Sequence, residues 1–242
     1  MIDNNNQIEP ASFDSLYLKL REHEGRIYSD KEVQQLPEIH NDHVYFKEWM
    51  IRRDSYERLI KYLVAKEKSL NILEVGSGNG WLSAKLATIP GSNVLGLEIN
   101  ICELNQAIRV FNRVSNLAFK KCDISKDVLT ENNFDIILFA ATIQYFSSFE
   151  LIINKSLDLL KEDGELHIID SHFYDKTGIP DARKRSAAYF SSLGFAEMKE
   201  MYFHHSKTDY ENYNHRILYQ PGKFAINFRR VKNPFPWICI TK

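Results

Sequence analysis

The stretch that decides the fold of this chain is ILEVGSGNGWLS, residues 72–83. Its first residues read as a buried strand, its glycines as a tight turn, and the residues from Trp81 onward as a helix that ends before Pro90. The glycines at 76, 78 and 80 let the backbone approach a ligand closely, because they lack Cβ atoms. This order of strand, turn and helix predicts a ligand site at the edge of an α/β sheet.

The spacing of these glycines argues against a dinucleotide site. The dinucleotide fingerprint G-x-G-x-x-G ends on a third glycine, and Trp81 occupies that position here. A glycine turn by itself also suits an ordinary strand-to-helix connection. The nature of the ligand therefore depends on residues elsewhere along the sheet.

Strand-like apolar runs alternate with helical segments from residue 46 onward, which is typical of a parallel sheet covered by helices. We expect a Rossmann-like, mostly parallel seven-stranded α/β sheet with helices on both faces. The expected strands are 70–75, 93–98, 117–123, 134–141 and 165–170, followed by an antiparallel pair made of 198–205 and 234–242. The expected helices are 46–64, 81–89, 101–111, 148–163 and 180–193.

The chain reads as a single domain with additions to its core. Residues 1–45 are expected to form a partly helical N-terminal cap, 46–205 the Rossmann-like core, and 233–242 the last strand. The insertion 206–232 is longer than a hairpin needs, and its aromatic and cationic side chains favour a lid. Those side chains are Tyr210, Tyr213, Arg216, Tyr219, Phe224, Phe228, Arg229 and Arg230.

Composition and charge exclude several classes of protein. The formal net charge of −1 and the short, separated basic clusters argue against a dedicated nucleic-acid partner. The longest apolar run, FDIILFAATI, is about half of the ~20 residues that cross a bilayer, and from the polar N-terminus we expect no signal peptide. The three cysteines lie far apart without metal-binding spacing, so we expect a reducing, cytoplasmic setting and no metal site. The sequence does not specify the oligomeric state.

Two acidic residues follow neighbouring strands at the same edge of the expected sheet. Glu98 ends the second strand, where a carboxylate can accept hydrogen bonds from the hydroxyls of a ribose. Asp123 ends the third strand in the same way. Asn100 and Glu103 read as an N-cap and capping box for the following helix, whose Ile101, Leu104, Ile108 and Phe111 are expected to face the core.

The chain resembles the class I S-adenosylmethionine-dependent methyltransferase family over roughly residues 46–205 and the last strand. The resemblance rests on ILEVGSGNGWLS, LGLEIN, KKCDIS, FDIILFAATIQYF and LLKEDGELHIID, in the order and spacing of that family. It implies S-adenosylmethionine as the cofactor, with its methionine part on the glycine turn, its ribose at the end of the second strand and its adenine after the third. The residues implied are Glu74, Gly76, Ser77, Gly78, Gly80, Glu98, Ile99, Asp123, Ile124 and Ala140.

Arg52 is a further candidate, since an arginine suits bidentate recognition of the cofactor carboxylate. Surface pairing of Arg52 with Glu48 or Glu57 is an equally open interpretation. Taken alone, Glu98 also suits a surface carboxylate, and Asp123 suits a turn residue or an N-cap.

Methyl transfer is an in-line displacement, and oxygen or nitrogen acceptors often need a general base. We expect His172 to serve, because it follows the end of a central strand with Asp170 nearby. Tyr145 is the second catalytic candidate, since Gln144-Tyr145 replaces a pair of histidines often found there in the resembled family. Other candidate bases are His40, His43, Tyr174, His204 and His205.

The expected reaction is methyl transfer to oxygen or nitrogen of a small organic molecule. The motifs of amino-directed nucleic-acid and cytosine methyltransferases are absent, and so are the clustered carboxylates of metal-dependent catechol-type enzymes. An alternative is a non-catalytic module that binds S-adenosylmethionine and acts through a protein partner. A nucleotide-dependent oxidoreductase with an unusual loop is a third possibility.

Overall fold

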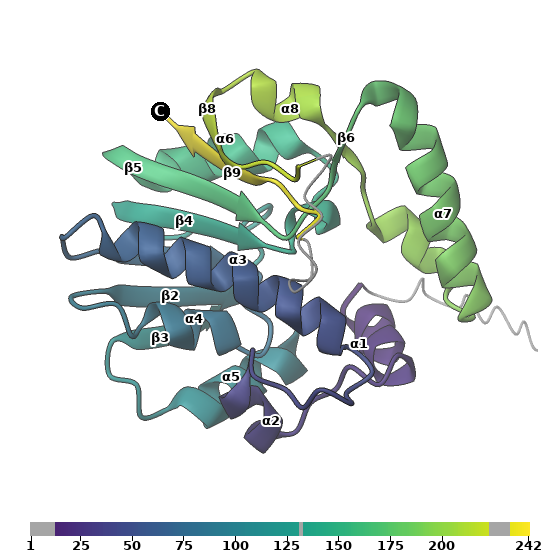
Figure 1. The fold of residues 1–242 in the computed structure, drawn as a ribbon, viewed down its shortest axis with the longest axis horizontal. Helices are drawn as coiled ribbons and strands as arrows, with labels where there is room; N and C mark the ends of the chain where they lie inside the picture. Colours follow the sequence, from purple (N-terminus) through teal and green to yellow (C-terminus); the bar gives the residue numbers. More distant parts are fainter. Residues whose placement is uncertain (1–12, 131–132, 223–232) are drawn as a thin grey trace, which may run out of the picture.

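The computed structural model describes residues 13–130, 133–222 and 233–242, and these form a seven-stranded sheet with helices on both faces (Figure 1). The strand order is β3-β2-β1-β4-β5-β9-β8, in which the first five strands are parallel and β9 runs antiparallel to both of its neighbours. The expected fold class is thereby confirmed. The strands are β1 (Asn71–Val75), β2 (Asn93–Glu98), β3 (Leu117–Lys121), β4 (Phe134–Ala140), β5 (Leu160–Ile169), β8 (Asn214–Tyr219) and β9 (Trp237–Thr241).

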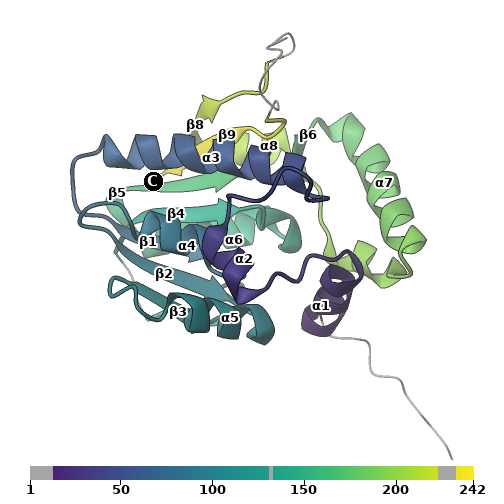
Figure 2. The ribbon, with the colours of Figure 1, turned by 60° about the horizontal axis from the view of Figure 1, so that its bottom comes forward.

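The helices divide between the two faces of this sheet, as Figures 1 and 2 show for α3 and α6. The α-helices are α1 (Phe13–His23), α2 (Asp30–Gln35), α3 (Phe46–Val64), α4 (Trp81–Leu86), α5 (Ile101–Phe111), α6 (Phe149–Leu159), α7 (Ile179–Ser192) and α8 (Lys207–Glu211). Short 3-10 helices are η1 (Ile143–Tyr145), η2 (Lys176–Gly178) and η3 (Ala196–Met201), and β6 (Phe173–Tyr174) pairs with β7 (His205–Ser206). No helix within the described part of the chain is long and apolar enough to span a bilayer.

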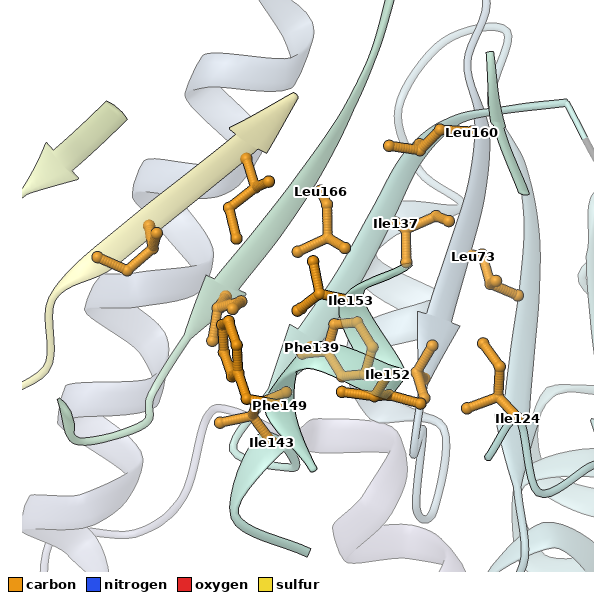
Figure 3. Close-up of a cluster of buried hydrophobic side chains, with 14 of the residues drawn as sticks. Leu73, Ile124, Ile137, Phe139, Ile143, Phe149, Ile152, Ile153, Leu160 and Leu166 are labelled. Carbon is orange, nitrogen blue, oxygen red and sulfur yellow. The ribbon is translucent and has the colours of Figure 1, made fainter. Parts of the chain in front are cut away.

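Strand β4 separates the two main layers of the core. Its Ile137 and Phe139 pack with Ile152 of α6 on one face (Figure 3), while Ile136 and Leu138 belong to the opposite cluster with α3. Each of these β4 side chains is at most 1% exposed. A central strand buried on both faces explains why its sequence is a continuous apolar run rather than an alternating one.

The predicted end of helix α6 at Asp163-Gly164 is wrong, because α6 ends at Leu159 and β5 begins at Leu160. Leu160 has extended backbone angles, is 3% exposed and pairs with Phe134 at the edge of β4. Burial and pairing of Leu160 therefore override the local turn signal of Asp163-Gly164.

The predicted antiparallel pair is also wrong in one member. Residues 198–205 form part of η3 and β7, and the partner of β9 is β8, from within the segment expected to be a lid. Strand β8 lies at the sheet edge and is mostly exposed or half-buried, so its sequence lacks the apolar alternation that marks inner strands. Residues 223–232, which carry Phe224, Phe228, Arg229 and Arg230 of the expected lid, lie outside the described residues.

Helix α5 turns a different face to the sheet than its sequence suggested. Leu104 and Ala107 are buried, whereas Ile101 and Ile108 are 47% and 46% exposed. Because the stripe of contact is centred on Leu104 and Ala107, the two isoleucines lie at its flanks. The N-cap is confirmed, since the Asn100 side chain accepts from the backbone N–H groups of Cys102 and Glu103.

Gly80 is required by packing of the helices against the sheet. Its φ is +80°, and a Cβ there would lie 2.5 Å from Cζ of Phe119 and 2.8 Å from Cβ of Ala107. Helix α4 can therefore begin against α5 and β3 only if residue 80 has no side chain.

We predict that Gly80→Ala lowers the free energy of unfolding by about 2–4 kcal/mol, since backbone strain adds to overpacking. Urea denaturation of the two proteins measures this difference. Gly178→Ala is the matched control, because Gly178 has φ of −87° and a Cβ added there would meet no atom within 4 Å. Equal effects of the two substitutions would contradict the packing role of Gly80.

Candidate functional site

A cavity of about 420 Å³ opens at the carboxyl ends of β1, β2 and β4. Ligands of open α/β sheets bind at this edge. Helix α1 contributes Phe13, Tyr17 and Arg21 to its wall, and α3 contributes Trp49 and Arg52. In Figures 1 and 2 the arrowheads of β4 and β5 point to the side on which α1 and α7 lie.

Most of the predicted site residues line this cavity together. They are Arg52, Glu74, Gly76, Ser77, Gly78, Glu98, Ile99, Asp123, Ile124, Ala140 and Tyr145. The structure does not bring Gly80 or His172 to the cavity wall. Gly80 instead packs against Phe119, and the ring of His172 lies 4.6 Å from that of Phe235.

The expectation that Asp170 shapes the surroundings of His172 is not met. Asp170 is buried and accepts a hydrogen bond from the hydroxyl of Ser55 on α3. Burial raises the pKa of Asp170 to about 6. The other candidate bases His40, His43, Tyr174, His204 and His205 are also absent from the cavity wall.

The glycine turn is pinned to the neighbouring strand and to the loop after β4. The N–H groups of Gly76 and Ser77 both donate to the carbonyl oxygen of Leu97 at 2.8 Å. Gly76 has φ of +72°, and a Cβ there would lie 2.5 Å from Cγ2 of Thr142. A Cβ on Gly78 would meet only the carboxylate of Glu103, at 3.6 Å or more, so Gly78 leaves its side of the cavity open.

Glu98 is held by three backbone N–H groups. Its Oε2 accepts from Gly78 at 2.7 Å, and its Oε1 accepts from Ile99 at 2.8 Å and Asn100 at 2.7 Å. Since a carboxylate offers roughly four acceptor positions, one remains on Oε2 for a ligand hydroxyl. Burial raises the pKa of Glu98, although the three N–H groups oppose that rise.

Three features show that the residues present fit a polar ligand such as S-adenosylmethionine. The hydroxyl oxygen of Ser77 is buried beside the cavity and has no hydrogen-bond partner among the described residues. An unpaired buried hydroxyl is costly unless a ligand completes its bonding. The open face of Gly78 and the remaining acceptor position of Glu98 lie on the same wall.

The carboxylate of Asp123 is partly occupied by hydrogen bonds and an ion pair within its own loop. Its carboxylate accepts from the N–H and hydroxyl of Ser125 and pairs with Lys126 at 2.9 Å. The pKa of Asp123 is lowered, because these hydrogen bonds outweigh the effect of burial. The side chain therefore shapes the loop, while Ile124 beside it is 3% exposed and lines the cavity.

Sequence reasoning missed the carboxylate of Glu103. The sequence places Glu103 in a capping box, but its carboxylate lines the cavity opposite Gly78. Burial and the neighbouring Glu98 raise the pKa of Glu103 to about 7. The third helical position suits either role, so no local signal separates a cap from a ligand-facing carboxylate.

Sequence reasoning also missed the wall formed by α1. The side chains of Phe13, Tyr17 and Arg21 line the cavity, and Arg21 donates to the hydroxyl of Tyr145 at 3.2 Å. These three residues follow a spacing of four along α1 and therefore share one face. Their spacing was a usable signal, but nothing local shows that this helix covers the sheet edge.

Arg52 pairs with Glu48, in agreement with one of its two open interpretations. Its Nε and Nη2 both donate to Oε1 of Glu48 at 3.1 Å. Glu48 also accepts from both terminal nitrogens of Arg26, at 2.9 Å and 2.6 Å. Arg52 nevertheless lines the cavity, so its pairing with Glu48 does not remove it from the site.

A second polar cluster lies within the sheet and the helix that covers it. Potential ligand atoms of Glu165, His167 and Cys239 lie within 4.8 Å of one another. Glu165 already pairs with Lys66 at 2.7 Å and Arg216 at 2.8 Å. Two cations against one carboxylate disfavour a metal ion there, so the cluster reads as a structural ion network.

The strand order, the glycine turn and the acidic end of β2 define the Rossmann-like fold of class I methyltransferases. A family model described as a methyltransferase domain matches residues 66–222. The chain therefore belongs to this methyltransferase domain family.

Two methyltransferases are similar to part of this chain. The malonyl-[acyl-carrier protein] O-methyltransferase of Acetivibrio thermocellus is 30% identical over 139 residues, which are 57% of this chain and 48% of that protein. The sterol 24-C-methyltransferase of Kluyveromyces lactis is 26% identical over 142 residues, 57% of this chain and 38% of that protein. This chain thus spans about half or less of the length of these relatives.

Solved structures share the fold over more of the chain. The magnesium protoporphyrin IX methyltransferase of Synechocystis PCC 6803, with bound S-adenosylhomocysteine, has a TM-score of 0.59 at 16% identity over 93% of this chain and 95% of its own. The geranyl diphosphate C-methyltransferase of Streptomyces coelicolor has a TM-score of 0.59 at 12% identity over 83% of this chain and 81% of its own. Identities this low show the shared fold alone.

Glu74 makes stability depend on pH in the absence of ligand. Its buried carboxyl accepts a hydrogen bond from the hydroxyl of Ser83, and burial raises its pKa to about 8. The folded state keeps a proton that the unfolded chain loses, so stability falls as pH rises from about 4.5 to about 8.

We predict that Glu74→Gln, measured by urea denaturation without ligand, gains about 2–4 kcal/mol over the parent protein between pH 4 and pH 9. The two proteins should be close in stability at low pH, where the parent carboxyl is neutral. Glu22→Gln on the exposed side of α1 is the control and should not alter the pH profile. A pH-independent difference between parent and Glu74→Gln would show that Glu74 folds already ionised.

Proposed function

We propose that this protein binds S-adenosylmethionine and transfers its methyl group to oxygen or nitrogen of a small organic molecule. The observation that carries the proposal is the carboxylate of Glu98, fixed by three backbone N–H groups beside the glycine turn. Such a carboxylate is preorganised to accept a ribose hydroxyl without reorganising on binding.

The other predicted residues around the Glu98 carboxylate lie where they could contact the rest of the cofactor. Arg52 would hold the carboxylate of the methionine part, and Ser77 and Gly78 would lie along it. Ile99 and Ile124 would provide the apolar contacts for the adenine. S-adenosylmethionine supplies an electrophilic methyl group on a sulfonium, and the residues of the chain bind, orient and shield it from water.

The charges on the cofactor side of the cavity suit a cation. Glu98 and Glu103 both line this space; burial raises the pKa of both carboxyls, and the neighbouring Glu98 raises that of Glu103 further. A positively charged sulfonium or amino group nearby would favour their ionised forms. The acidic side of the cavity is therefore matched to a positively charged ligand.

The size of the cavity supports a small acceptor. A volume of about 420 Å³ lies within the range of small-molecule sites, and aromatic side chains line part of it. The named relatives include an O-methyltransferase and C-methyltransferases. Their names do not select the acceptor atom, so transfer to oxygen or nitrogen stays a prediction from sequence, as do a cytoplasmic location and the lack of a nucleic-acid partner.

The role of Glu98 is tested by calorimetric titration with S-adenosylmethionine. We expect Glu98→Ala to weaken binding about 100-fold and Glu98→Gln about 10-fold, because alanine removes the acceptor whereas glutamine keeps a neutral one. Glu162→Ala, an exposed carboxylate in the part of β5 before its buried run, is the control and should bind like the parent protein.

The same preparations test catalysis and the competing functions. Labelled S-adenosylmethionine mixed with protein and small-molecule extract should give a labelled small product. Binding without any turnover would favour the non-catalytic module, and preferential binding of NAD would favour the oxidoreductase. Unchanged affinity in both Glu98 variants would overturn the proposed cofactor placement.

A further inference from the structure

Helix α1 places a guanidinium beside two phenol rings in the cavity wall. Arg21 donates from Nη2 to the hydroxyl of Tyr145 at 3.2 Å, and its guanidinium carbon lies 4.8 Å from the ring centroid of Tyr17. The two phenol rings meet edge to face with centroids 5.7 Å apart. One cation therefore contacts two hydroxylated aromatic side chains.

Further aromatic rings surround this group. The ring of Phe13 lies 5.4 Å from that of Tyr145, and the ring of Tyr202 lies 5.8 Å from it. Phe13, Tyr17, Arg21 and Tyr145 all line the cavity. The result is an apolar wall with a single polar centre, an arrangement that orients a ligand carrying one polar group.

The polar centre donates hydrogen bonds and does not accept protons. Arg21 has only N–H donors, so the Tyr145 oxygen accepts from it and the Tyr145 proton is left to donate elsewhere. Burial raises the pKa of Tyr17 well above its usual value, so this phenol also keeps its proton. Both hydroxyls beside Arg21 therefore suit an oxygen acceptor, above all an anionic one.

The arginines of this wall share their carboxylate partners. Arg21 and Arg26 share Glu24 at 3.0 Å and 3.3 Å, while Arg26 and Arg52 share Glu48 at 2.6 Å and 3.1 Å. Three guanidinium groups thus face two carboxylates. Because Arg52 would hold the carboxylate of the cofactor, Arg21 is the guanidinium of this wall that is left for the acceptor.

No histidine lines the cavity in the described part of the chain. An alcohol or a protonated amine would need a base to lose its proton, whereas a carboxylate is already ionised at neutral pH. A carboxylate acceptor would therefore use the donors that are present and would need no base.

We propose that the methyl acceptor is a carboxylate on an apolar molecule, held by Arg21 and the hydroxyls of Tyr17 and Tyr145. This inference rests on the proposed function. One carboxylate oxygen is held by the donors, and a lone pair on the other oxygen forms a bond to the methyl carbon. The carbon–sulfur bond breaks, its electron pair stays on sulfur, and the products are a methyl ester and S-adenosylhomocysteine with no proton transferred.

Binding is tested on protein saturated with S-adenosylhomocysteine, titrated calorimetrically with cinnamate and with its neutral analogue cinnamamide. We expect cinnamate to bind about tenfold more tightly than cinnamamide, because only the acid is an anion. Arg21→Gln should abolish this preference, and Tyr145→Phe should reduce it about threefold while leaving the affinity for S-adenosylhomocysteine unchanged.

Lys19→Gln is the matched control, since it removes a cation from the exposed side of the same helix. It should bind both probes like the parent protein. Thermal unfolding of each variant, with Tyr17→Phe as a milder second change, separates loss of the site from loss of the fold.

Equal binding of acid and amide, or binding of neither, would overturn the proposal. A loss of S-adenosylhomocysteine affinity in Arg21→Gln as large as its loss of cinnamate affinity would also overturn it.

The product gives an independent answer. Protein, tritium-labelled S-adenosylmethionine and a mixture of apolar carboxylic acids should yield label that mild alkali releases as volatile methanol, as expected of a methyl ester. Label that is transferred but stable to alkali would contradict the carboxylate acceptor and leave methyl transfer intact. Failure to bind S-adenosylmethionine would instead contradict the proposed function itself.

Discussion

The site depends on the convergence of three backbone N–H groups on the carboxylate of Glu98. This single side chain joins the glycine turn after β1, the end of β2 and the start of α5. The N–H groups of Gly76 and Ser77 reinforce the arrangement by donating to Leu97 on the same strand. A charged acceptor held by donors from two connections fixes the turn before any ligand arrives, so little ordering cost is left for binding.

The charges of the cavity follow from which elements supply its walls. Strand β2 and helix α5 supply the carboxylates Glu98 and Glu103, while α1 and α3 supply Arg21 and Arg52. A ligand with a cationic centre suits the first wall, and an anionic partner suits the second. Two reactants of opposite charge would be brought together in this way, with their reacting groups facing each other across the cavity.

The sequence was sufficient for most of the fold, through local signals, and for choosing candidate residues most of which the structure brings to one cavity. A buried strand such as β4 shows itself by its apolar run, and Glu98 by its place after a strand. The edge strand β8 was not predicted, because none of its side chains is fully buried and its sequence lacks an apolar pattern. Tyr17 and Arg21 were not predicted as site residues, because they line the cavity only through the packing of α1 against the sheet edge. This is a long-range contact that no local pattern encodes. His172 was favoured from its position after β5, but its side chain lies outside the cavity wall.

A crystal structure with bound S-adenosylhomocysteine tests the central claim most directly. The account predicts a ribose hydroxyl within hydrogen-bond distance of Oε2 of Glu98, with the three N–H groups of Gly78, Ile99 and Asn100 still donating to that carboxylate. A ribose bound away from Glu98, or a Glu98 side chain turned out of the cavity, would contradict it.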